Sequence, residues 1–116
     1  MSEDSEEQLQ VAFPASPTFT RIGRVAVVGL GLRLGIEVST VEQLRAAVDA
    51  AVTALQGAGR ISAHASWTAT ALTVTIGNPA ASITDRQALT EELWALLGET
   101  VIVEPDRVVM TLPTGT

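Results

Sequence analysis

The chain has 116 residues, of which 47% are hydrophobic, and a formal net charge of −6 at pH 7. This length and composition fit one domain with a packed core, and the acidic charge disfavours nucleic acid and anionic membrane surfaces as partners. The sequence has no apolar run of about 18 residues that could span a membrane and no cysteine for a disulfide or a thiolate metal site. We therefore expect a cytoplasmic protein without a metal or cofactor.

The two ends of the chain differ in character from its middle. Residues 1–7 are mostly acidic, so we expect a flexible leader there. Residues 8–112 should form the single domain, and residues 113–116 should form a short tail. The domain opens with a half-buried strand, because apolar side chains alternate with polar or small ones at Leu9, Val11 and Phe13.

A long helix is predicted next, over residues 17–34. Ser16 can cap its N-terminus, and Pro17 suits a first helical position because that position needs no backbone donor. Gly35 can end the helix in a left-handed conformation. Helical spacing predicts one wide buried face made of Phe19, Ile22, Val25, Ala26, Val28, Leu30, Leu32 and Leu34.

The second predicted helix starts at a double capping signal and ends before Gly57. Ser39 and Thr40 are each followed three residues later by Glu or Gln, which is the spacing of a capping box. Apolar residues then recur at helical intervals at Val41, Leu44, Val48, Ala51, Val52 and Leu55. This regular spacing predicts a helix that covers the core.

The remaining elements alternate between hairpins and a third helix. Strands are expected over residues 61–67 and 72–76, followed by a loop at 77–79. The third helix should begin at Thr84, which has Gln87 at capping-box spacing, and should end at Gly98. A closing hairpin completes the order β-α-α-β-β-α-β-β. This order predicts an α+β fold, a two-layer α/β sandwich with three helices on one face of a mostly antiparallel sheet.

Two segments resemble the anti-sigma-factor serine kinases, which are small bacterial proteins of the histidine-kinase-like ATPase superfamily. The segment F-P-A-S-P-x-F-x-R-x-x-R at residues 13–24 resembles the strand-to-helix opening of that family. The segment V-E-x-L-R-x-A-V-x-x-A-x-T-x-L at residues 41–55 is similar to its nucleotide-binding helix. The resemblance covers residues 9–112 and implies a reduced domain of that superfamily.

The chain departs from this family at the nucleotide site. The family has a general-base Glu and a magnesium-binding Asn where this sequence has Ala50 and Ala54. The family also has an Asp that reads adenine, whereas here the strand leaves into Gly77 and Asn78. Asn78 could accept one hydrogen bond from an adenine amino group. The loop before Thr84 is too short for a phosphate lid, so we expect neither kinase nor ATPase activity.

Several single residues allow a functional and a structural interpretation. Arg21 falls where the family has a partner-contacting arginine, and Arg24 could extend the same patch, but both could also be solvated surface residues. His64 lies on the strand phase that should face away from the helices. Trp67 and Trp94 lie on the apolar phase of their elements, and we expect both in the core.

We therefore expect a non-catalytic protein-interaction module derived from an anti-sigma-factor kinase scaffold. The resemblance implies a regulatory role, with a sigma factor, an anti-sigma antagonist or a second copy of the chain as partner. One alternative is a self-associating structural module, for which a homodimer is expected. Another alternative is a protein that retains nucleotide binding through Asn78.

Overall fold

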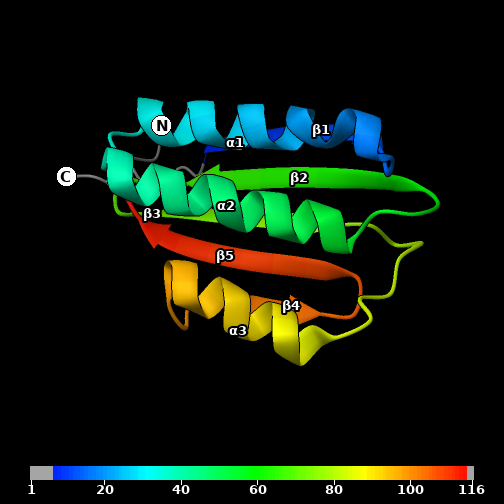
Figure 1. Ribbon diagram of the computed structural model, residues 1–116. Helices are drawn as coiled ribbons and strands as arrows, with labels where there is room; N and C mark the ends of the chain where they lie inside the picture. The colour runs from blue at the N-terminus through cyan, green and yellow to red at the C-terminus, as the bar shows by residue number, and fades with distance from the viewer. Residues whose placement is uncertain (1–6, 115–116) are drawn as a thin grey trace.

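The computed structural model describes residues 7–114. They form an α+β fold in which the helices α1, α2 and α3 cover one face of a five-stranded antiparallel sheet (Figure 1). The sheet order is β1-β2-β3-β5-β4, so β1 and β4 are its two edges. The predicted order of elements and the two-layer architecture are confirmed. None of the helices within residues 7–114 has both the length and the apolar character needed to cross a membrane.

The sheet is built from three long central strands and two edges. Its elements are β1 (Glu7–Pro14), β2 (Arg60–Trp67), β3 (Ala71–Gly77), β4 (Ile102–Glu104) and β5 (Arg107–Pro113). Residue pairing is regular, with His64 opposite Thr75 and Val74 opposite Met110. Because side chains alternate between the two faces of a strand, one face of β2, β3 and β5 is fully apolar and faces the helices. Its buried residues are Ile61, Ala63, Ala65, Leu72, Val74, Ile76, Val108, Met110 and Leu112.

The helical layer consists of α1 (Thr20–Arg33), α2 (Val38–Ala54) and α3 (Arg86–Leu97), with a short 3-10 turn, η1 (Pro17–Phe19), before α1. α2 lies between the other two helices and packs against both of them (Figure 1). Helical spacing predicted all of its buried residues except Ala47. The six buried residues are Val41, Leu44, Ala47, Val48, Ala51 and Val52.

The helix boundaries differ from the predicted ones at their N-termini. The first helix begins as a 3-10 turn at Pro17, and Ser16 makes no side-chain cap. α2 begins at Val38, so Ser39 and Thr40 lie within its first turn rather than at the cap. The cap of α3 is Asp85, whose Oδ1 accepts a hydrogen bond from the amide of Ala88 at 3.0 Å. Gly35 and Gly98 follow the helices with positive φ, as expected.

The domain limits also shift slightly. Glu7 was expected in the leader but begins β1, and Pro113 was expected in the tail but ends β5. The rest of the expected leader and the last two residues of the expected tail lie outside the described residues.

The predicted buried face of α1 was wrong in part: Val28, Leu30 and Leu34 are half-buried and pack against the core, but Phe19, Ile22, Val25 and Leu32 are exposed. The residues of α1 that are buried are Gly23, Val27 and Gly31, which recur every four residues. A Cβ at Gly23 would lie 3.1 Å from Cζ of Phe13, and one at Gly31 would lie 3.5 Å from Val41 Cγ2. Ile22, Val25 and Leu32 are therefore turned outward, because α1 makes its closest approach to the core through Gly23 and Gly31.

The aromatic residues of the later elements are also less buried than predicted. Trp94 is 42% exposed, although its indole nitrogen Nε1 donates a hydrogen bond to the carbonyl of Val101 at 2.8 Å. Trp67 is half-buried at the end of β2 and packs against the margin of the core. His64 lies on the face of the sheet opposite the helices, as predicted, where its Nε2 is 3.2 Å from Oε1 of Gln8.

We expect Gly59→Ala to lower the free energy of unfolding by about 2–4 kcal/mol. Gly59 has φ +84°, and an added Cβ would lie 2.8 Å from Ala80 Cβ and 2.9 Å from Asn78 Oδ1. The matched control is Gly29→Ala in α1, where an added Cβ meets no atom within 4 Å. This control should raise stability by about 0.5–1 kcal/mol through helix propensity. Urea denaturation followed by circular dichroism measures both changes, and equal stabilities would contradict the expectation.

Candidate functional site

Ala50 and Ala54 lie on the side of α2 that faces α3. Both are half-buried and pack against the core. Their methyl groups contribute to the floor of an open hollow of about 540 Å³ between the two helices, lined also by Arg45, Ala46, Asp49, Thr53, Leu89 and Glu92. The hollow is thus built on alanine and leucine side chains, with polar groups at its rim.

Two of the three charged groups of this rim, Asp49 and Arg45, form ion pairs with neighbouring residues. Asp49 Oδ2 accepts a hydrogen bond from Arg24 Nη1 at 3.1 Å, which joins α2 to α1. Arg45 Nε donates to Glu42 Oε2 at 3.0 Å within α2. No group of three or more His, Cys, Asp or Glu residues that could hold a metal ion occurs in residues 7–114. Because magnesium requires several oxygen ligands, the alanine floor offers it no coordination site.

Asn78 follows the last residue of β3 and is 1% exposed. Its Nδ2 donates two hydrogen bonds of 2.9 Å, one to the carbonyl of Leu55 at the end of α2 and one to that of Ala58. Its Oδ1 accepts a hydrogen bond from the amide of Ala80 at 3.0 Å. Both donor hydrogens of this side chain, and its acceptor oxygen, are thus used within the protein. The side chain ties the helical layer to the sheet.

The backbone around Asn78 is held equally firmly. The amide of Asn78 donates to the carbonyl of Asp106, and its carbonyl accepts from the amide of Ala81, both at 2.9 Å. Further along the loop, the amide of Ile83 donates to the carbonyl of Pro105 at 2.7 Å. The segment between β3 and α3 is therefore pinned to the turn between β4 and β5. In that turn, a hydrogen bond and the negative charge of Glu104 raise the pKa of Arg107.

The two candidate partner-binding arginines lie one turn apart on α1 but have different surroundings. Arg24 is half-exposed and pairs with Asp49 of α2. Arg21 is exposed, next to Ile22 on the outer side of the helix. Arg24 therefore joins two helices, whereas Arg21 faces outward.

Sequence spacing failed to identify the exposed apolar face of α1. Val25 is 62% exposed and Leu32 is 52% exposed, and Phe19 and Ile22 are also exposed. Gly29 lies between Val25 and Leu32 along the same side of the helix, with open space above it. We call the side of α1 formed by Ile22, Val25, Gly29 and Leu32 the outer face. The signal that could have revealed it is the four-residue repeat of Gly23, Val27 and Gly31, which is typical of close packing on the opposite side.

A comparison of the sequence with protein-family models and with curated proteins finds no match.

We expect Asn78→Ala to lower the free energy of unfolding by about 2–4 kcal/mol, because it leaves the buried carbonyl of Leu55 and the part-buried carbonyl of Ala58 without their donor. Asn78→Asp should also destabilise the protein, since its carboxylate would face two carbonyl oxygens. The control is Gln43→Ala, an exposed change on α2 that should alter stability by less than about 0.5 kcal/mol. Thermal and urea denaturation test these values. A stable Asn78→Asp variant would show that the side chain has no structural role.

Proposed function

We propose that the chain is a non-catalytic protein-interaction module that serves a regulatory role on a scaffold derived from an anti-sigma-factor kinase. The observation that carries this proposal is the outer face of α1, where Val25 and Leu32 are more than half exposed in a domain that already has a complete core. Contiguous exposed apolar surface bordered by polar groups is typical of protein-binding sites.

The charge on α1 supports a protein partner. The helix carries Arg21, Arg24 and Arg33 and no acidic residue, although the whole chain has a net charge of −6. Since Arg24 is paired with Asp49, Arg21 and Arg33 are left near the two ends of the outer face. An apolar stripe between two arginines suits a partner surface with apolar residues at its centre and carboxylates at its ends.

The side chains that line the hollow between α2 and α3 support the non-catalytic part of this proposal. The resemblance places the general base and the magnesium ligand at Ala50 and Ala54, whose side chains can serve neither role. Asn78, the remaining polar candidate for adenine recognition, already uses its amide on Leu55, Ala58 and Ala80. A ligand could recruit this amide only by breaking buried hydrogen bonds that connect α2 to β3.

On this proposal the partner is a protein of the kinds that the resemblance implies: a sigma factor, an anti-sigma antagonist or a second copy of the chain. Arg21 is the residue we assign to the contact. Arg24 contributes indirectly, because its ion pair with Asp49 fixes α1 against α2.

We expect isothermal titration to detect no binding of magnesium-ATP tighter than about 1 mM. The double variant Ala50→Glu, Ala54→Asn should not restore binding, because the amide of Asn78 stays engaged and no segment covers the phosphates. A wild-type dissociation constant in the low micromolar range would contradict the proposal that this site is inactive.

Arg21→Glu should reduce the recovery of the partner in affinity purification from the native cells by at least about tenfold, since it replaces a cation on the contact surface with an anion. The matched control is Arg86→Glu, which makes the same change at an exposed residue of α3. Quantitative mass spectrometry of the bound fraction measures both. Equal recovery with the two variants would exclude the outer face of α1 as the contact surface.

A further inference from the structure

Two surfaces without a partner lie on the same flank of the molecule. β1 is an eight-residue edge strand, and its outer side pairs with no strand in residues 7–114. α1 lies in front of β1 (Figure 1), and its outer face is exposed on the same flank. An unpaired strand edge exposes backbone donors and acceptors, and an apolar helix face exposes hydrocarbon. One partner could satisfy both surfaces at once.

A groove of about 520 Å³ lies between these two elements at one end of the flank. Leu9 and Trp67 line it from the sheet, and Ala26, Gly29 and Leu30 line it from α1. Gly29 leaves the groove open, because an added Cβ there would meet no atom within 4 Å. Gly29 belongs both to this groove and to the outer face, so the strand edge and the outer face meet at this residue.

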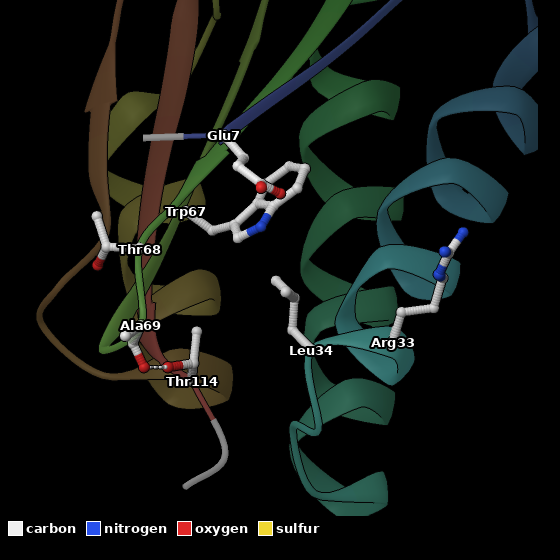
Figure 2. A pocket seen from close by; sticks show the side chains of 7 residues that line it. All are labelled: Glu7, Arg33, Leu34, Trp67, Thr68, Ala69 and Thr114. Atoms are coloured by element: carbon white, nitrogen blue, oxygen red, sulfur yellow. Dashed lines mark hydrogen bonds between the residues drawn. The ribbon is translucent and has the colours of Figure 1, made fainter. Parts of the chain in front are cut away.

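One negative and one positive side chain lie at the end of this groove. Figure 2 shows Glu7 and Trp67 on the sheet side of a pocket and Leu34 and Arg33 on its helix side. α1 runs antiparallel to β1, since Gly23 lies beside Phe13 while Arg33 and Glu7 line one pocket. The flank therefore has Arg21 near one end and Glu7 with Arg33 at the other.

We infer that this flank binds a second copy of the chain around a two-fold axis. This inference names the partner of the surface proposed above and rests on that proposal. β1 pairs with β1 of the copy in antiparallel fashion, which extends one sheet across both protomers, and the outer faces of the two α1 helices pack against each other. The symmetry brings Arg21 of each copy to the end that carries Glu7 and Arg33 in the other.

The spacing of the two layers permits this arrangement. α1 packs over both β1 and β2, so its axis lies inward of the edge by about half the strand spacing. Strands about 4.8 Å apart across the joint then leave about 10 Å between the helix axes, which is a normal helix-packing distance. Gly29 at the joint allows the closer approach that small residues permit.

The area of the flank is sufficient for a dimer of moderate affinity. An eight-residue strand is about 26 Å long, and the flank is about 20 Å deep through one sheet and one helix layer. This gives roughly 500–600 Å² for each copy, or about 1,000–1,200 Å² in total, at the lower end of specific interfaces. We therefore expect a dissociation constant in the micromolar range.

Sedimentation velocity between about 5 and 500 µM tests this inference. The wild-type chain should shift from monomer to dimer, and Val25→Glu should weaken the dimer at least about tenfold because it places two carboxylates in the apolar joint. The matched control is Ile102→Glu, an equally exposed apolar residue on the opposite sheet edge, β4, which should leave the dimer unchanged. Circular dichroism checks that each variant is folded.

A charge exchange tests the two-fold geometry itself. Arg21→Glu and Glu7→Arg should each weaken the dimer, because like charges then meet at both ends. The double variant should recover most of the wild-type affinity. A wild-type chain that stays monomeric to 500 µM, equal dimerisation of Val25→Glu and Ile102→Glu, or a double variant no better than the singles would overturn the inference.

The outcomes also separate this inference from the proposed function. A monomeric chain whose recovered cellular partner is lost in both Val25→Glu and Arg21→Glu would reject the second copy and keep the interaction surface. Such a result would favour an acidic amphipathic segment of another protein on the outer face. Unchanged recovery and unchanged dimerisation in both variants would reject the inference and the proposed function together.

Discussion

The side chain of Asn78 is the interaction on which the two layers depend. It is a neutral amide in a fully buried position, and it joins the last turn of α2, the loop before β2 and the turn after β3. A buried polar group of this kind is costly unless all its hydrogen bonds are made. Since they are made here, the group specifies one relative placement of helix and sheet. Apolar packing alone would define that placement less sharply.

This structural role of Asn78 also holds the loop that follows β3 in place. In a nucleotide-binding domain of the kind that the sequence resembles, this region would have to admit a ligand. Here the amide of Asn78 and the amide of Ile83 both donate to the turn between β4 and β5, and Gly59 leaves just enough room for the arrangement. The polar groups at this end of the fold therefore stabilise the fold itself. The exposed apolar side chains of the helical layer lie elsewhere, on the outer face of α1.

Much of the fold could be predicted from sequence because its signals are local. Alternation along residues 61–67 and 72–76 gave the central strands, and the spacing of Val41, Leu44, Val48 and Val52 gave the buried side of α2. The buried side of α1 could not be predicted in this way, since residue hydrophobicity ranks Gly23 and Gly31 below Val25 and Leu32. Their burial depends on how closely Phe13 and Val41 approach, which is a tertiary property. The hydrogen bonds of Asn78 likewise join residues about 20 positions apart.

The two edges of the sheet are unequal, and this inequality limits how copies of the chain can assemble. β4 has only three residues, and its turn is held by the ion pair between Glu104 and Arg107. Such an edge is a poor template for another strand, whereas β1 offers eight residues. With one receptive edge per protomer, pairing uses up the available edge on both sides. A dimer of the kind inferred above would therefore close at two subunits, because the three-residue β4 at each outer edge is a poor template for a further strand.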